Sequence, residues 1–265
     1  MEKEKRTILP AHAIVLAAGK GTRMKSPLPK VLHPLGGTPL ILHVLSNAVT
    51  AGLASITSVL GYGKEEVERT ILEWAEGVEG VNFYFAIQEE QLGTGHAVMV
   101  AEATSRGKFP YVVVLLGDVP LLKSTTLRNA VYQAIAEESD VLVITTRLNN
   151  PAGYGRIVRN AMGEIVAIKE DKDATEEEKQ INEINTGIFV FRDQSLWPYL
   201  KNLSCNNAQN EYYLTDMVEE LLRRGKKVSS YTSENPLEFY GVNSKDQLET
   251  LEKLYQARSY ERSRS

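Results

Sequence analysis

The stretch AIVLAAGKGTRMKSPLPK, residues 13–30, constrains this chain most, because its apolar run stops abruptly at a glycine-rich bend. The run is long enough for a strand buried on both faces and too short for a helix. Gly19 and Gly21 lack a Cβ, so the backbone can turn sharply and bring consecutive N–H groups against an anion. Arg23 and Lys30 add two cations suited to phosphate oxygens. The stretch is therefore expected to cradle a triphosphate.

Two familiar glycine motifs do not fit this bend. The pattern GxxxxGK followed by Ser or Thr does not occur in the chain, and the dinucleotide pattern GxGxxG fails because Met24 occupies its third glycine position. The spacing alone leaves an alternative open, namely a tight strand-to-loop turn with solvated cations. Residues farther along the chain favour phosphate binding.

Composition limits the class of protein. Hydrophobic residues make up 43% of the 265 residues and charged residues 24%, and the net charge is −4. These values are ordinary for a globular protein and favour neither a nucleic-acid partner nor a membrane surface. The single cysteine, Cys205, excludes an intramolecular disulfide, and the four histidines lack the close spacing of a metal site. Pro10 and His12 interrupt the apolar run that superficially resembles a secretion signal, so we expect a cytoplasmic protein.

Apolar runs and helical periodicities alternate through the first half of the chain. Strands are expected at residues 13–18, 55–60, 81–88, 111–116 and 140–146, and helices at 39–51, 64–75, from Thr94 onward and at 121–136. Gly52 has the position of a C-terminal helix cap, and Thr94 that of an N-terminal cap. Such alternation predicts a parallel sheet.

The second half has shorter elements. A hairpin is expected from residues 151–158 and 164–168, followed by a strand at 188–191, a helix at 210–224, a strand at 228–231 and a final helix that Ser244 caps. Without an internal repeat or a flexible linker, nothing divides the chain into independent domains.

Polar residues follow several of the predicted strands. Asp118 comes after the strand at 111–116, at the edge where open α/β sheets place their ligands. One carboxylate beside a polyphosphate is a normal Mg²⁺ anchor, although Asp118 also suits a turn before Pro120. Gln88 carries both donor and acceptor, as the reading of a pyrimidine edge requires, and the polar cluster at 182–187 suits a sugar. For both of these, an ordinary loop remains the alternative.

Several motifs occur along the chain in the same order as in a known enzyme family. The motifs are LAAGKGTRM with SPLPK, QLGTGHA, GDVPL, GYGRI, KEDKDAT, EINTGI, NEYYLTD and GVN. Together they resemble the sugar-nucleotide pyrophosphorylases, and most closely the uridyltransferase domain of GlmU-type N-acetylglucosamine-1-phosphate uridyltransferases. The resemblance covers about residues 13–256, and QLGTGHA with EINTGI and NEYYLTD is its most specific part.

The resemblance implies a Rossmann-like nucleotidyltransferase fold. Its central sheet is expected to be mostly parallel, with helices on both faces and a smaller β-rich sugar-binding lobe. The expected organisation is an N-terminal extension at 1–12, a nucleotide half at about 13–148, a sugar-binding half at about 149–256 and a polar tail at 257–265.

The resemblance also implies roles for individual residues. Arg23 and Lys30 match the catalytic cations that neutralise phosphates. The nucleotide-binding positions match Leu16, Ala17, Ala18, Gly19, Gln88, Gly93, Thr94, Gly117 and Asp118. Gly155, Glu170, Asn185 and Asn243 match the sugar side of the site, and Asp118 with Asn243 matches the ligands of Mg²⁺.

The implied reaction joins UTP and N-acetylglucosamine 1-phosphate to give UDP-N-acetylglucosamine and pyrophosphate, with Mg²⁺ as the cofactor. Another enzyme on the same fold, a glucose-1-phosphate uridylyltransferase or thymidylyltransferase, is the nearest alternative. A nucleotide-sugar-binding protein without catalysis is a further alternative, against which the presence of Lys30, Asp118 and Asn243 argues.

Two departures from the family pattern are visible. Leu116 stands where the family commonly has Tyr before the Gly-Asp pair, so the contact of that hydroxyl is missing. The typical bifunctional enzyme continues into a β-helix acetyltransferase domain, whereas this sequence stops at Ser265. We therefore expect either a truncated piece of such an enzyme or a natural single-activity one, and a monomer or weak oligomer.

Overall fold

The computed structural model describes residues 7–262, with the side chains of 258–262 excepted. One sheet lies at the centre of the described chain, and its main strand order is β11-β7-β10-β6-β1-β4-β5. The bounds of these strands are β1 Ala11–Ala17, β4 Ser55–Leu60, β5 Asn82–Ile87, β6 Tyr111–Leu116, β7 Val141–Arg147, β10 Glu183–Arg192 and β11 Val228–Ser233. The predicted strands at 55–60 and 111–116 are confirmed residue for residue.

The sheet is mostly parallel, with one central exception. β1 runs parallel to both of its neighbours, with Ala13 opposite Ile56 of β4 and Val113 of β6. β10 runs antiparallel between β6 and β7, and β11 is again parallel to β7. Because β1 and β6 are covered on both faces, their sequences are apolar throughout rather than alternating, apart from the buried His12 of β1.

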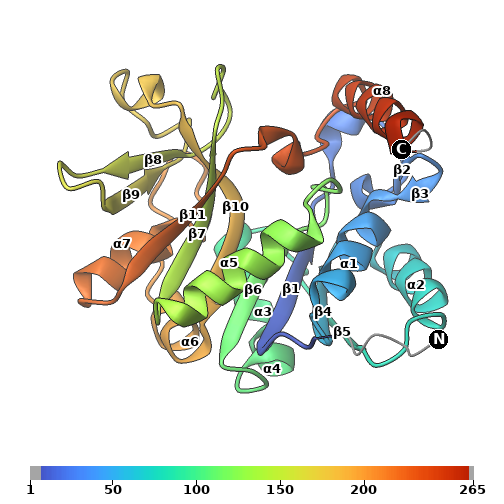
Figure 1. The fold of residues 1–265 in the computed structure, drawn as a ribbon, viewed down its shortest axis with the longest axis horizontal. Coiled ribbons are helices and arrows are strands. Elements are labelled where there is room, and N and C mark those ends of the chain that lie inside the picture. The colour runs from blue at the N-terminus through green and yellow to red at the C-terminus, as the bar shows by residue number, and fades with distance from the viewer. Residues whose placement is uncertain (1–6, 263–265) are drawn as a thin grey trace.

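Helices cover both faces of the sheet. On one face lie α1 (Leu40–Ala51), α2 (Lys64–Ala75) and α5 (Ser124–Ala136); on the other lie α3 (Thr94–Val100), α4 (Glu102–Ser105), α6 (Asp193–Leu200) and α7 (Asp216–Arg223). Figure 1 shows α1 and α5 in front of the sheet. Val15 of β1 packs into the first core and Ile14 into the second, as expected for successive residues of a strand. The predicted fold class is confirmed.

A small β-rich lobe branches from one strand of the sheet. It consists of β8 (Arg156–Arg159) and β9 (Ile165–Lys169), which form the predicted hairpin at the upper left of Figure 1. Ile184 of β10 pairs with Arg156 of β8, whereas the later residues of β10 pair with β6. The change of partner occurs at a register shift, where Gly187 has a φ of +78°.

The C-terminal helix returns to the N-terminal part of the chain. α8 (Lys245–Arg262) lies beside the short strands β2 (Pro34–Leu35) and β3 (Thr38–Pro39), as Figure 1 shows. Leu251 of α8 and Leu35 of β2 share a third apolar cluster, and the N–H of Gly36 donates to the carboxylate of Glu252 at 2.9 Å. Ser244 accepts from the N–H of Gln247, which confirms the predicted cap. Residues 263–265 of the expected polar tail lie outside the described residues.

Short 3₁₀ turns join several of these elements. They are η1 Thr22–Met24, η2 Lys30–Leu32, η3 Glu178–Gln180 and η4 Pro236–Phe239. Gly52 ends α1 with a φ of +111°, which confirms the predicted C-terminal cap. Across residues 7–262, no helix combines the length and the apolar character that a membrane crossing requires.

Three predicted helix features are wrong. The helix expected at 210–224 begins only at Asp216, because the preceding residues form a loop in which Tyr212 exchanges main-chain hydrogen bonds with Leu92 and Gly95. The helix expected at 121–136 begins at Ser124. Thr94 is not the cap of α3: Gly93 occupies that position, and the Thr94 hydroxyl accepts instead from the N–H of Leu214.

Candidate active site

A cavity opens at one edge of the sheet, where the carboxyl ends of β1 and β6 meet. Leu16 and Leu116 line it from these two strand ends, and the Gly117 N–H donates to the Leu16 carbonyl at 2.9 Å. Further lining segments come from the start of α3, the loop before β8, the loop after β9, the bulge of β10 and the segments before α7 and α8. The site is therefore built from both halves of the chain.

Lys30 lies next to two residues that line this cavity, and its ammonium faces an oxygen atom of each. Its Nζ donates to Asp118 Oδ2 at 2.5 Å and to Asn243 Oδ1 at 3.2 Å. Gly21 makes this placement possible, because its φ is +61° and a Cβ there would lie 2.6 Å from the Cβ of Lys30. The glycine bend and the lysine of residues 13–30 thus belong to one packed unit.

Asp118 and Asn243 are fixed by main-chain contacts. The N–H of Val242 donates to the carbonyl of Asp118 at 3.0 Å, and the N–H of Asn243 donates to Gln247 Oε1 at 2.8 Å. Gln247 belongs to α8. The C-terminal helix therefore holds Asn243 near Asp118, which is far away in sequence. The structure brings together the two residues predicted as metal ligands.

The arrangement of these oxygens fits Mg²⁺. One carboxylate oxygen and one amide oxygen converge on the same cation, here the ammonium of Lys30. Mg²⁺ takes few protein oxygens and keeps waters and phosphate oxygens as its other ligands. Within the described chain, no group of three His, Cys, Asp or Glu side chains gathers as a closed metal cage. The donor set therefore suits an ion that a nucleotide helps to hold.

Gly155, Glu170 and Asn185 line the other side of the cavity. A Cβ on Gly155 would lie 3.5 Å from both carboxylate oxygens of Glu170, so these two residues are in close contact. The N–H of Asn185 donates to the carbonyl of Gly155 at 2.8 Å. The structure brings together three of the four residues that the resemblance implies for the sugar side, and the fourth, Asn243, lines the same cavity near Asp118.

Glu170 is partly buried in the cavity wall. Burial raises the pKa of its carboxyl above the usual value, against the opposing effect of the hydrogen bond from the Thr215 hydroxyl. That hydroxyl lies 3.0 Å from Glu170 Oε1. Thr215 lines the cavity and belongs to the NEYYLTD motif, which the sequence singles out without assigning a role to any of its residues.

Tyr154 is a second cavity residue that the sequence reasoning missed. It precedes Gly155 in the GYGRI motif. Burial, followed by the proximity of Tyr240 and Asp118, raises the pKa of its phenol. The motif signals its importance, but an aromatic residue beside glycines in a loop carries no pattern that distinguishes a ligand contact from packing.

The remaining predicted nucleotide residues surround the cavity or lie behind it. Ala17 and Ala18 are buried, and Gly19 is exposed with open space around it. Gln88 is also buried, and its amide donates to the Gly93 carbonyl at 3.1 Å. Arg23 is exposed in η1 and makes no ion pair with any residue of the described chain. Of the predicted nucleotide set, Leu16, Thr94 and Asp118 line the cavity itself.

Comparison with protein families gives one match. Residues 12–236 match the model of the family described as nucleotidyl transferase. This range begins in β1 and ends at the start of η4, so it includes both sides of the cavity except the segment that carries Asn243.

Curated relatives match the same part of the chain. A bifunctional protein GlmU from Carboxydothermus hydrogenoformans is 46% identical over 247 residues, which cover 91% of this chain and 52% of that protein. A bifunctional protein GlmU from Halalkalibacterium halodurans is 42% identical over 246 residues, 93% of this chain and 52% of the relative. The chain spans about half the length of the curated relatives that it matches. These similarities confirm the resemblance that the motifs predict.

A solved structure shares the fold. The crystal structure of a UDP-glucose pyrophosphorylase complexed with UDP-glucose superposes with a TM-score of 0.76, covering 94% of this chain and 99% of that one. The two sequences are 20% identical. At this identity the likeness concerns the fold alone.

Proposed function

Starting from the fact that the chain belongs to the nucleotidyl transferase family, we propose that it joins UTP and N-acetylglucosamine 1-phosphate into UDP-N-acetylglucosamine and pyrophosphate. One observation carries the proposal. Lys30, Asp118 and Asn243 converge at one side of a cavity whose other side Gly155, Glu170 and Asn185 line. A cation with metal-binding oxygens thus faces a wall of polar groups suited to a sugar. The GlmU relatives support the choice of uridine and of the acetamido sugar.

The reaction needs positioning and charge neutralisation more than proton transfer. The sugar phosphate is already anionic at neutral pH, so attack of its oxygen on the α-phosphorus of UTP requires no general base. Repulsion between two anions is the main obstacle, and phosphoryl transfer in general is catalysed by positioning and electrostatics. Lys30 and Arg23 are assigned to neutralising the phosphates, and the bend at Gly19 to presenting main-chain N–H groups.

Asp118 and Asn243 would hold Mg²⁺, because their oxygens already converge on a cation. When bound there, the ion supplies further neutralisation of phosphate oxygens. On the opposite wall, Glu170 and Asn185 are assigned to orienting the sugar. Burial raises the pKa of Glu170, so its carboxyl enters the neutral, donor-bearing form more readily than an exposed glutamate.

The decisive test is pyrophosphate release with UTP, Mg²⁺ and each of three sugar phosphates, namely N-acetylglucosamine, glucose and glucosamine 1-phosphate. Preference for the acetylated sugar supports the proposal. Preference for glucose 1-phosphate keeps the mechanism and overturns the substrate. If no pyrophosphate is released with any of the three sugar phosphates, the alternative of a nucleotide-sugar-binding protein without catalysis is supported instead. Asp118→Asn is the matched control, because it keeps the side-chain shape and removes the charge that would hold the ion.

A further inference from the structure

Arg156 is a charged residue in an unusual place. It is the first residue of β8, and its side chain is only 2% exposed. Its Nη1 donates to the carbonyl of Tyr154, and its Nη2 donates to Asp171 Oδ1 at 2.9 Å. Its Nε finds no hydrogen-bond partner within the described residues. A buried guanidinium with an unsatisfied nitrogen is costly, and replacement of such a group by an apolar side chain is often neutral or stabilising. Contribution to stability is therefore a poor explanation for Arg156.

The two partners of Arg156 lie beside residues of the cavity. Tyr154 immediately precedes Gly155, and Asp171 immediately follows Glu170. Gly155 and Glu170 flank the hairpin of β8 and β9, one before its first strand and one after its second. One planar guanidinium thus connects the loop that enters the hairpin with the loop that leaves it. Because the fork of an arginine has fixed geometry, it sets the spacing between these loops.

The spacing between these two loops determines how residues of the cavity wall are placed. A Cβ on Gly155 would touch the carboxylate of Glu170, and the carbonyl of Gly155 accepts from the N–H of Asn185. A shift of either loop would therefore change the distance between Glu170 and Gly155, and with it the place of Asn185. Arg156 itself does not line the cavity.

We infer that Arg156 is a positioning residue for the sugar phosphate: its guanidinium clamps the loops of Gly155 and Glu170 and sets the width of the sugar side of the site. The inference rests on the proposed function. The nucleotide side depends on β1, the glycine bend and Lys30, none of which contacts Arg156. The role predicts a selective effect on the sugar phosphate and little effect on UTP.

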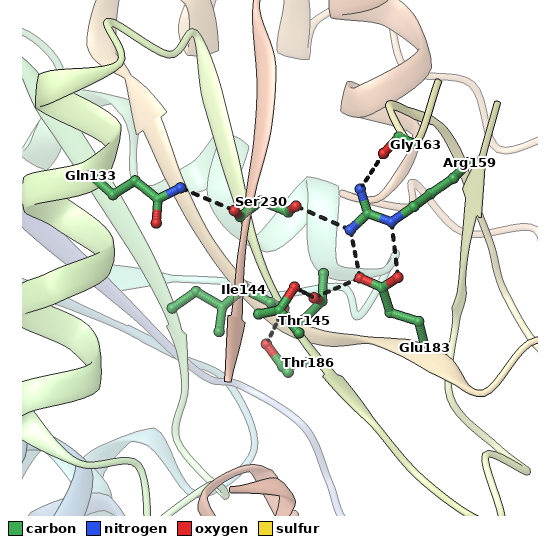
Figure 2. Close-up of polar contacts among 9 residues, drawn as sticks. Gln133, Ile144, Thr145, Arg159, Gly163, Glu183, Thr186 and Ser230 are labelled. Atoms are coloured by element: carbon green, nitrogen blue, oxygen red, sulfur yellow. Dashed lines mark hydrogen bonds and ion pairs between the residues drawn. The ribbon is translucent and has the colours of Figure 1, made fainter. Parts of the chain in front are cut away.

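Arg159 provides a matched control on the same strand. Figure 2 shows its guanidinium against the carboxylate of Glu183, with hydrogen bonds of 2.9 and 2.6 Å. Further bonds join Arg159 to the carbonyl of Gly163 at 2.8 Å and to the hydroxyl of Ser230 at 3.0 Å. No partner of Arg159 belongs to the described wall of the cavity. Arg159 therefore anchors the hairpin at a distance from the predicted sugar contacts.

The experiment compares Arg156→Met, Arg156→Lys and Arg159→Met with the wild-type chain. KM for N-acetylglucosamine 1-phosphate, KM for UTP, kcat and the melting temperature are measured for each variant. Calorimetry compares the affinity for UDP-N-acetylglucosamine with that for UTP, which gives a readout independent of turnover. Asp171→Ala is included as a variant at the more exposed partner, in case Arg156→Met does not fold.

For Arg156→Met we expect KM for the sugar phosphate to rise about tenfold, equivalent to about 1.4 kcal/mol, while KM for UTP stays within about twofold. Arg156→Lys keeps the charge without the fork and should fall between wild type and Arg156→Met. Asp171→Ala should also raise KM for the sugar phosphate, but by less than Arg156→Met does. Arg159→Met should lower the melting temperature without altering the ratio of the two KM values.

Equal rises in both KM values would overturn the inference, as would the same selective rise in Arg159→Met. A wild-type chain that releases no pyrophosphate but binds UDP-N-acetylglucosamine refutes the proposed function alone, and calorimetry of Arg156→Met then decides the positioning role. A wild-type chain that binds no UDP-N-acetylglucosamine overturns both.

Discussion

At the scale of single residues, the ammonium of Lys30 connects parts of the chain that are far apart in sequence. It contacts Asp118 after β6 and Asn243 before α8. The sequence places the glycine bend and Asp118 after two strands of a parallel sheet, at the edge where such sheets bind ligands, and the structure shows that these strands, β1 and β6, are adjacent. The sequence provides no such argument for Asn243, whose position depends on the packing of α8 against β2.

The first prediction concerns Lys30. Lys30→Ala should lower kcat by about 10²- to 10³-fold, by analogy with the loss of one well-placed stabilising donor, which costs about 2.7 to 4 kcal/mol of barrier. Turnover is measured with saturating UTP, Mg²⁺ and sugar phosphate, alongside the melting temperature. Lys253→Ala, at an exposed position on α8, is the control that removes one positive charge elsewhere. Unchanged turnover in Lys30→Ala would remove this side chain from the mechanism.

Arg156 shows the limit of sequence reasoning at this scale. A lone arginine inside the predicted hairpin arm at 151–158 is typical of a solvated position, because arginine is seldom fully buried. The GYGRI motif draws attention to its neighbours rather than to its side chain. Only the tertiary structure shows that its two partners flank Gly155 and Glu170.

At the scale of elements, the hairpin of β8 and β9 is held to the sheet by charge as well as by strand pairing. Glu183 of β10 accepts two hydrogen bonds from Arg159 of β8 and one from Thr145 of β7 (Figure 2). Burial by itself raises the pKa of Glu183, but the bonds from Arg159 and Thr145 outweigh it and bring the pKa below the usual value. The ionised carboxylate is thus the form that stabilises the fold.

The second prediction follows from the lowered pKa of Glu183. A carboxyl with a lowered pKa in the folded state stabilises the protein above its unfolded-state pKa of 4.5 and loses this contribution as the pH falls through its folded-state pKa. Glu183→Gln should therefore lower the free energy of unfolding at pH 7 by about 1.5 to 3 kcal/mol, the value of a hydrogen bond to a charged group. The difference between variant and wild type should shrink below pH 4.5 in urea unfolding series. A difference that does not depend on pH would contradict this account.

The third prediction concerns the first turn of α7. Here a pKa is raised rather than lowered, so stability depends on pH in the opposite direction. Burial, with a contribution from the charge of Glu219, raises the pKa of Asp216 to about 6. Its contribution to stability is therefore fully present below pH 3.8 and is lost as the pH rises through about 6. Asp216→Asn should be more stable than wild type at pH 7.5, by less than about 3 kcal/mol because solvent screens a partly exposed group. Melting temperatures at pH 4.5 and 7.5 measure this, and an advantage that is larger at pH 4.5 would refute it.

The elements also differ in how far the sequence predicts them. The strand at 55–60 and the helix at 64–75 match the structure at both ends, because apolar periodicity decides them locally. Leu214 extends the helical spacing of Met217 and Val218 to before α7, yet residues 210–215 form a loop because Tyr212 bonds to Leu92 and Gly95. The antiparallel direction of β10 likewise depends on the path of the hairpin, which no local pattern contains.

At the scale of the whole molecule, α8 connects the segment around β2 to the site. Leu251 is fully buried in the cluster shared with Leu35 and Val242, and Gln247 accepts from the N–H of Asn243. The position of a predicted metal ligand thus depends on the packing of a terminal helix. Stability and metal binding should be linked here more tightly than elsewhere in the fold.

The fourth prediction tests this link. Leu251→Ala should lower the free energy of unfolding by about 2 to 5 kcal/mol and raise the Mg²⁺ concentration needed for half-maximal activity. Leu221→Ala, which truncates an equally buried leucine in α7 within a different core, should lower stability similarly and leave the Mg²⁺ requirement unchanged. Metal titrations of both variants, performed well below their melting temperatures, separate the two outcomes. An equal change in both would show that the Mg²⁺ requirement follows global stability.

β10 joins the small lobe to the central sheet. Its last residues are clamped between β6 and β7, while its first residues carry the hairpin through Ile184. The first residues of β10 also pair with β7, so the lobe is joined to the sheet on the hairpin side of the register shift beside Gly187. Leu116 packs where a Cβ on Gly187 would stand, and both residues line the cavity, so the register shift of β10 lies in the cavity wall. A substitution that moves the hairpin relative to the sheet would therefore act on Leu116 at the cavity wall.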